Sequence, residues 1–305
     1  AVADAGEFTK NRRWIRRSDR MVDDPFGERT VQAMMHPGYQ NPDFIGPSGP
    51  IDPGLSLLNI QTLDGKPLGL LANFSMHYFS GHPGASADYC GRFAEAMSGR
   101  LAPGEKDFVA VMSQGTSGDL WWGDYALPAA QSWDIIEYTN RLAGLAEAAL
   151  QGIEYKSDGD IAMTEERTTF GRRVPDEKRL AWADQKLKEM GDNRPRNQPE
   201  VYAEQARWIK ENPEEEAVLQ AIRIGDIAIT GLPNEVYAIT GLKLKARSPF
   251  AHTFNMSLAN GAAGYIPPPE QHVLGGYTTW PARTAGLEEN AEPKMVEALV
   301  GMMMG

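Results

Sequence analysis

Four apolar segments of the chain form two pairs, and a short turn containing glycine separates the members of each pair. The first pair is 55–63 and 68–74, around Asp64-Gly65, and the second is 217–224 and 227–232, around Gly225-Asp226. A tight Asp-Gly or Gly-Asp turn between two apolar runs is typical of a β-hairpin. Segment 68–74 is apolar on both faces, which predicts a central strand covered on both sides.

Apolar residues at helical spacing predict helices between these strands. Four of them recur every four positions: Tyr89, Phe93, Met97 and Leu101. They predict a helix that begins near Asp88 and turns this face to the core. Further helices are expected over 133–150, 180–190, 200–210, 235–246 and 292–302, and further strands over 108–112, which should be buried, and 253–258. Strands that alternate with helices, together with two hairpins, predict an α/β fold with mixed β-sheets flanked by helices.

Two segments differ from this pattern. Residues 1–54 are rich in glycine and proline and are expected to be loop. Residues 155–215 are rich in charge and poor in aliphatic side chains, apart from the two helical stretches expected there. We interpret 155–215 as a helical insertion on the surface, with a lid over a site as the alternative. Both segments are assigned to a single domain, 1–305.

Composition and charge exclude several classes of partner. The 305 residues include 30 Lys and Arg against 41 Asp and Glu, which gives a net charge of −11. Nucleic-acid binders carry a basic stripe, and anionic membranes attract basic segments, so neither partner is expected. No stretch approaches the roughly 18 apolar residues that span a bilayer, so no transmembrane segment is expected. Cys90 is the single cysteine, which excludes an internal disulfide.

His77 is the first candidate for chemistry, because it ends the apolar run that begins at Leu70. A strand end is a rigid place for a metal ligand or a proton shuttle, and α/β sheets place their sites at the carboxyl ends of their strands. A histidine in this position is also often only a hydrogen-bonded structural residue.

Three further residues stand in suggestive contexts. Glu235 follows an apolar strand and is expected in the first turn of a helix, where it would either ligate a metal or only interact with the helix dipole. Tyr265 lies in a stretch of glycine and alanine, so its ring or hydroxyl is expected to approach another group closely. Tyr277 follows Gly275-Gly276 in a second glycine-led turn. Either tyrosine could instead be a packing residue.

The loop from Ser113 to Asp119 follows the strand expected over 108–112 and consists mainly of small residues. Its backbone amides could bind an anion, or it could be only a tight turn. It is neither a nucleophile elbow nor a phosphate-binding Lys loop, because the spacing differs from both. A serine hydrolase that pairs Ser113 or Ser117 with His77 therefore has little support.

Taken in order, these motifs resemble the catalytic domain of neutral/alkaline (non-lysosomal) ceramidases and their bacterial homologues. The resemblance spans almost the whole chain, and its specificity lies in the order and spacing of short motifs. They are Asn11-Arg12-Arg13, Gly49–Pro53, Asn73 to His77, Ala87 to Gly91, Gly118-Asp119, Pro233–Glu235, Gly264-Tyr265 and Tyr277.

The resemblance implies a zinc-dependent amidohydrolase in which a zinc-bound water attacks the amide carbonyl of an N-acyl, ceramide-like lipid. In that family two histidines, a glutamate and a tyrosine hold the ion. The match implies His77, Glu235 and Tyr265 as metal ligands and Tyr277 as the contact to the developing oxyanion. Arg12, with a one-residue uncertainty against Arg13, matches an arginine near the scissile amide. The resemblance also favours an exported protein, periplasmic or extracellular.

The chain departs from the family pattern in three places. The motif with the family's first zinc histidine is absent, so we expect it upstream of Ala1, with His36 and His82 as possible substitutes. Trp121 stands where the family has a serine, and the family's C-terminal immunoglobulin-like domain is absent. These departures leave a second hypothesis open, that of a non-catalytic relative that binds a ligand in the same cleft.

Overall fold

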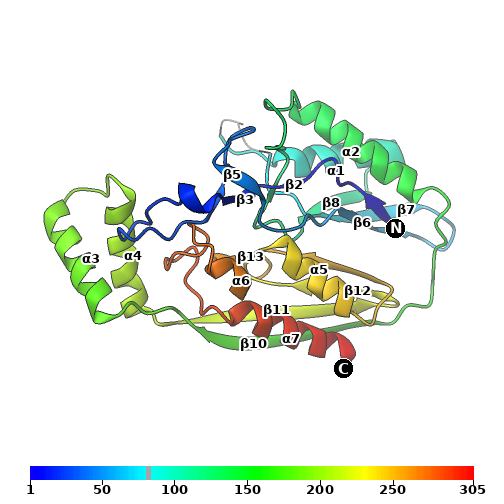
Figure 1. Ribbon diagram of the computed structural model, residues 1–305. Coiled ribbons are helices and arrows are strands. Elements are labelled where there is room, and N and C mark those ends of the chain that lie inside the picture. The colour runs from blue at the N-terminus through cyan, green and yellow to red at the C-terminus, as the bar shows by residue number, and fades with distance from the viewer. Residues whose placement is uncertain (80–83) are drawn as a thin grey trace.

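The computed structural model describes residues 1–79 and 84–305 and has the predicted mixed α/β fold (Figure 1). Two four-stranded sheets form its framework, one mainly from the first half of the chain and one from the second. No helix in this described part of the chain combines the length and the apolar character needed to cross a bilayer.

The first sheet has the order β1-β6-β7-β8, from Val2–Asp4, Gly54–Gln61, Pro67–Phe74 and Val109–Gln114. β6 and β7 form the predicted antiparallel hairpin, and β8 lies parallel to β7. The prediction that 68–74 is a central strand is confirmed. The prediction of a buried strand at 108–112 is wrong, because β8 lies at the sheet edge, with Val109 60% and Val111 47% exposed.

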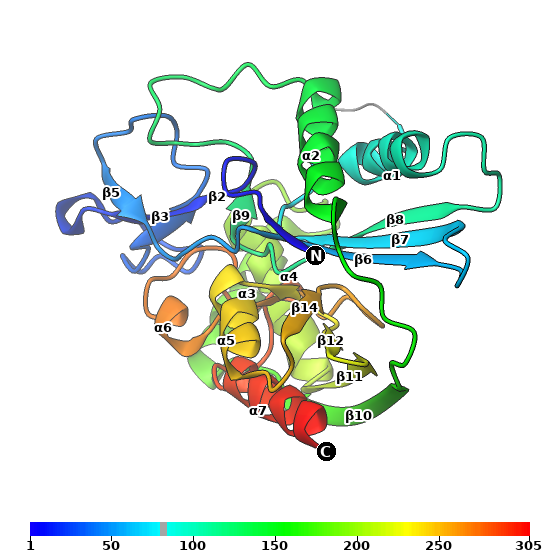
Figure 2. The same ribbon diagram turned by 90° about the vertical axis from the view of Figure 1, so that its right-hand side faces the viewer.

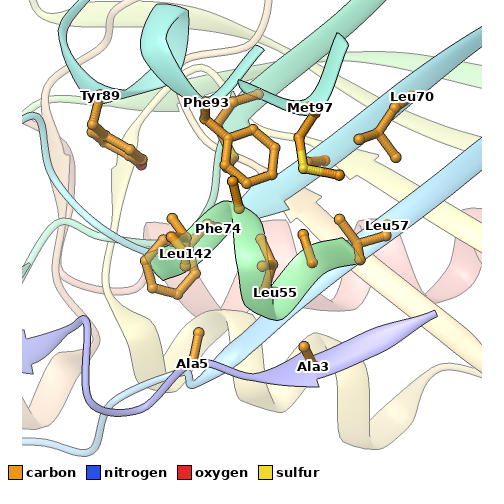
Figure 3. Packing of buried hydrophobic residues seen from close by; sticks show 14 of the residues in the cluster. Ala3, Ala5, Leu55, Leu57, Leu70, Phe74, Tyr89, Phe93, Met97 and Leu142 are labelled. Carbon is orange, nitrogen blue, oxygen red and sulfur yellow. The ribbon is translucent and has the colours of Figure 1, made fainter. Parts of the chain in front are cut away.

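Two helices, α1 (Asp88–Leu101) and α2 (Ile135–Leu150), cover one face of this sheet (Figure 2). Tyr89, Phe93 and Met97 of α1 are fully buried against the strands, as their spacing predicts (Figure 3). The Asp134 side chain accepts hydrogen bonds from two backbone N–H groups in the first turn of α2, which fixes where that helix begins.

The second sheet has the order β10-β11-β12-β14, from Ile161–Gly171, Glu214–Ile224, Ile227–Gly231 and His252–Met256. β11 and β12 form the second predicted hairpin, and β14 lies parallel to β12. The helices α5 (Ala238–Arg247) and α7 (Ala291–Met304) pack on this sheet through a second apolar core.

The helical insertion is shorter than predicted. Its two helices, α3 (Glu177–Met190) and α4 (Gln198–Glu211), form a hairpin that projects from the two sheets (Figure 1). Residues 161–171, predicted as part of the insertion, instead form β10 and pair along their whole length with β11. β10 is exposed and polar over most of its length, so it lacks the apolar alternation by which strands are found in sequences.

The prediction that residues 1–54 are loop is wrong. The segment contains β1 and four further strands, β2 (Lys10–Asn11), β3 (Arg13–Arg16), β4 (Ala33–Met35) and β5 (Phe44–Pro47), and a 3₁₀ turn at Ser18–Arg20. β3, β4 and β5 form a small sheet of their own, and β2 pairs with β9 (Leu120–Trp121), more than a hundred residues away. Strands of two to four residues are too short for a periodic pattern.

The two large sheets meet at β7 and β14. The Asn73 amide of β7 donates to the Asn255 carbonyl oxygen of β14 at 3.0 Å, and the Ser257 N–H donates to the Gln114 carbonyl oxygen at the end of β8. The carboxyl ends of parallel strands from both sheets therefore converge. Ligand sites of α/β sheets lie outside such ends.

Candidate functional site

A cavity of about 190 Å³ lies where these strand ends converge. Two of the predicted site residues, His77 and Glu235, line it together. The other lining residues are Tyr78, Gln114, Ser117, Ser257 and Leu258. Gln114 and Ser117 belong to the small-residue loop that the sequence singles out, whereas Ser257, just after β14, has no signal in the sequence.

Glu235 and Tyr265 are register neighbours. β13 (Glu235–Val236) pairs in parallel with β15 (Tyr265–Ile266), which sets Glu235 directly opposite Tyr265. The predicted helix at 235–246 therefore begins later, at Ala238, and the placement of Glu235 in its first turn is wrong. Burial raises the pKa of the Glu235 carboxyl, against the opposing effects of Tyr265 and of the Arg12 charge.

Gly264 makes this pairing possible. Its φ is +78°, a conformation that L-residues rarely adopt. A Cβ atom there would lie 2.5 Å from the backbone of Thr284. The glycine before Tyr265 is therefore required by both conformation and space.

His77 lies three residues beyond the end of β7 and is half-buried. Burial, assisted by the positive charge of Arg12, lowers the pKa of its imidazole to about 4. The ring is thus neutral at neutral pH, which is the form that binds metal ions. Its Nδ1 lies 3.4 Å from the Tyr78 carbonyl oxygen.

Arg12, rather than Arg13, points to this group of residues. Its side chain is 3% exposed, and its Nη2 donates to the Gly118 carbonyl oxygen at 3.1 Å and to the Tyr265 hydroxyl at 3.3 Å. Arg13 points the other way, because successive side chains of an extended chain alternate. Its fully buried guanidinium donates to the side chain and carbonyl oxygen of Gln271 and to the Gly275 carbonyl oxygen.

Tyr277 completes the group from a turn near the C-terminal end of the chain. Its ring stands edge-on to that of Tyr265, with centroids 5.6 Å apart. The turn follows the short helix α6 (Pro269–His272) and is held by the bonds from Arg13. The structure therefore brings together all five residues that the resemblance implies.

His36 and His82 are the possible substitutes for the family's first zinc histidine. His36 contacts Arg12 through one ring nitrogen and Tyr125 through the other. Both nitrogens are therefore engaged within the protein. His82 lies outside the described residues. Outside 80–83, the structure contains no cluster of three or more His, Cys, Asp or Glu side chains that could hold a metal ion.

The hydroxyls of the two candidate serines are hydrogen-bonded to nearby residues other than His77. The Ser113 hydroxyl donates to the Ala72 carbonyl oxygen and accepts from Asn73, within the first sheet. Ser117 lines the cavity with His77, but its hydroxyl is hydrogen-bonded to the Gln114 amide. Among the described residues, neither serine hydroxyl is hydrogen-bonded to the His77 ring. In the part of the chain that it describes, the structure therefore shows no serine that His77 could activate as a nucleophile.

Comparison with known proteins gives a likeness at the level of structure. No family model matches the chain. No curated protein matches it either. Solved structures do match it, among them a neutral ceramidase from Pseudomonas aeruginosa, with a TM-score of 0.56 and 16% identity, and a ceramidase complexed with C2, with a TM-score of 0.58 and 17% identity. Each match covers 83% of this chain.

This chain has the fold of those ceramidases. It spans about half of their length, 46% and 48% respectively. At this level of identity the likeness concerns the fold and the order of its elements, whereas the chemistry must be argued from the site itself.

Proposed function

We propose that this chain carries the active site of a zinc-dependent amide hydrolase that acts on N-acyl, ceramide-like lipids. The observation that supports the proposal is the convergence of His77, Glu235, Tyr265, Tyr277 and Arg12 at the strand ends of a ceramidase-like fold. Two of these residues come from the first third of the chain and three from the last third, so closeness in the sequence does not explain why they converge.

The donor chemistry at the site fits zinc. The neutral His77 imidazole and the Glu235 carboxylate share one cavity, and Tyr265 is the register neighbour of Glu235. Three nitrogen and oxygen ligands with an open position are typical of catalytic zinc sites. A zinc ion held by these residues would supply Lewis acidity and make a water-derived nucleophile available near neutral pH.

The remaining residues of the group have roles that follow from their positions. Arg12 offers a buried positive charge beside Tyr265, suited to orient an amide carbonyl. Tyr277, whose ring packs edge-on against Tyr265, is the candidate hydrogen-bond donor to the developing oxyanion.

Zinc content and hydrolysis together test the proposal. The purified protein, including any longer native form, should bind one zinc ion and release fatty acid from an N-acyl sphingosine. His77→Ala and Glu235→Gln should each lower zinc affinity and abolish most hydrolysis. His252→Ala is the control, since this exposed histidine begins β14 at the opposite end of the sheet. Absence of both zinc and hydrolysis in the native protein would refute the proposal.

A non-catalytic relative that binds an N-acyl ligand is the second candidate, favoured by the three-residue ligand set and by Trp121 beside the site. Calorimetric binding of a ceramide without turnover, in protein loaded with zinc, would support this candidate over the first.

A further inference from the structure

His36 is bound to Arg12 through both its backbone and its side chain. Its N–H donates to the Arg12 carbonyl oxygen at 2.9 Å, and its ring Nε2 lies 3.4 Å from Arg12 Nη1. The residue follows β4 with a φ of +54°, in the left-handed region. This conformation is uncommon for a residue with a Cβ atom, although histidine adopts it more often than most. Strain of this kind persists where the surrounding structure imposes it, and it clusters at functional sites.

The hydrogen bonds assign the tautomer of the His36 ring. A guanidinium group only donates, so Nε2 must accept from Arg12. Nδ1 therefore carries the proton and donates to the Tyr125 hydroxyl, 2.5 Å away. Burial, assisted by the positive charge of Arg12, lowers the pKa of the His36 imidazole to about 4, in agreement with a neutral ring.

Aromatic rings hold the imidazole in this orientation. The His36 ring stands edge-on to Trp121 and to Tyr125, with centroids 5.0 and 5.9 Å away. Tyr125 is buried and packs on Tyr39. Trp121, the residue that departs from the ceramidase pattern, thus forms part of the support for His36.

The guanidinium of Arg12 is planar, so a hydrogen bond at Nη1 also fixes the direction in which Nη2 donates. Its Nη2 reaches Tyr265 and Gly118, while its Nη1 is held by His36, and its Nε has no partner among the described residues. Without His36, Arg12 would keep only the bonds at Nη2 and could rotate about them. The precision of the Arg12–Tyr265 contact therefore depends on the imidazole.

We propose that His36, held by Tyr125, is a positioning residue that fixes the Arg12 guanidinium against Tyr265. The expected effect of His36 on kcat rests on the proposed function. Its effect on the orientation of Arg12 rests on the geometry alone. It also excludes His36 from the metal-ligand set, because both ring nitrogens are engaged.

Three variants test the inference. His36→Leu keeps the bulk of the side chain and removes its polar atoms, His36→Gln restores an acceptor for Arg12, and Tyr125→Phe removes the partner of Nδ1. Displacing a positioning group costs about 10- to 100-fold in activity. We expect His36→Leu to lower kcat by this factor with little change in KM, His36→Gln to recover most of it, and all three to bind zinc as the native protein does. His252→Leu is the matched control.

A readout independent of activity separates this inference from the proposed function. In ¹⁵N-arginine NMR spectra, the Arg12 Nε–H signal, assigned by its loss in Arg12→Lys, should broaden or shift in His36→Leu and return in His36→Gln. An unchanged signal and unchanged kcat in His36→Leu would overturn the inference, as would loss of zinc stoichiometry, which would make His36 a ligand. A native protein without zinc or hydrolysis would refute the proposed function, while the NMR comparison would still decide the role of His36.

Discussion

At the scale of single residues, the site depends on a few positions that tolerate no substitute. Gly264 is one of them, because its positive φ and the nearby Thr284 backbone leave no room for a Cβ atom. Gly191, which ends α3, also has a positive φ but has open space around it. A substitution at Gly191 therefore measures the energetic cost of a positive φ alone, whereas one at Gly264 adds the cost of a steric clash.

We expect Gly191→Ala to lower the free energy of unfolding by about 1–3 kcal/mol, because the Gly191 backbone (φ +61°, ψ −140°) lies close to a region that only glycine adopts readily. Gly264→Ala should cost more than that and displace Tyr265, because backbone atoms rather than a flexible side chain obstruct the new methyl group. Urea denaturation of both variants measures the difference. Equal losses would show that the strand pair around Gly264 relaxes without strain.

Tyr277 gives a prediction about catalysis rather than stability. Removing one preorganised donor to an oxyanion costs about 10²- to 10³-fold in kcat. We expect this loss in Tyr277→Phe, with zinc affinity retained, because the ring keeps its packing on Tyr265. Tyr155→Phe, at an exposed tyrosine bonded to Asn59, should leave kcat unchanged. Full activity of Tyr277→Phe would remove this residue from the mechanism.

Residue-scale contacts are the part of the site that the sequence alone could not predict. Glu235 and Tyr265 are thirty positions apart, and the strands that pair them have two residues each. His36 has no informative neighbours in the sequence, and its contact to Arg12 depends on how β3 and β4 fold together. The local sequence context singled out His77, Glu235, Tyr265 and Tyr277 one by one, whereas only the resemblance to a family indicated Arg12 and a shared site.

At the scale of elements, the α3–α4 hairpin is tied to the segment that carries Tyr277. Tyr202 of α4 stands edge-on to Trp280, with ring centroids 5.4 Å apart, and the Gln205 side chain accepts from the backbone N–H of Arg283. Phe26, from the N-terminal part of the chain, packs on Tyr202 as well. The hairpin thus supports the Tyr277 turn from outside.

Loss of this support should loosen the turn. In Tyr202→Ala we expect faster amide hydrogen exchange in peptides that cover 277–285 and unchanged exchange in α1. Glu189→Ala, an exposed change on α3, is the control. Exchange rates equal to those of the native protein would mean that the buried Arg13 and the partly buried Arg173 hold the turn by themselves.

Elements with long apolar periods were predictable, and short or exposed ones were not. The β6–β7 and β11–β12 hairpins and α1 follow directly from their patterns. The sequence does not indicate β10, although it is eleven residues long, because most of its side chains face solvent and apolar and polar residues do not alternate along it. Tertiary pairing with β11, rather than local preference, makes it a strand.

At the scale of the whole molecule, three histidines act together on acid stability. Burial lowers the pKa values of His36, His77 and His272 to about 4, against an ordinary value of 6.5. Between these values the unfolded chain takes up protons that the folded protein does not, so folding loses free energy as pH falls from about 6.5 to about 4. Asp119 and Glu235, whose pKa values burial raises, act in the opposite sense at the acid end.

Comparison with a variant isolates one of these groups. His272 lies away from the cavity, beside the positive charges of Arg173 and Arg13. In metal-free protein we expect the melting temperature of His272→Gln to fall less steeply between pH 6.5 and 4 than that of the native chain. Parallel curves for the two proteins would show that His272 titrates normally in the folded state.

The join between the two sheets gives the site a mechanical role. His77 extends from the first sheet, Glu235 and Tyr265 follow the second, and the seam between them is closed by single bonds such as that from Asn73 to Asn255. An ion coordinated by these three side chains would therefore link the two halves of the molecule. Filling the site and locking the two halves together would then be a single event.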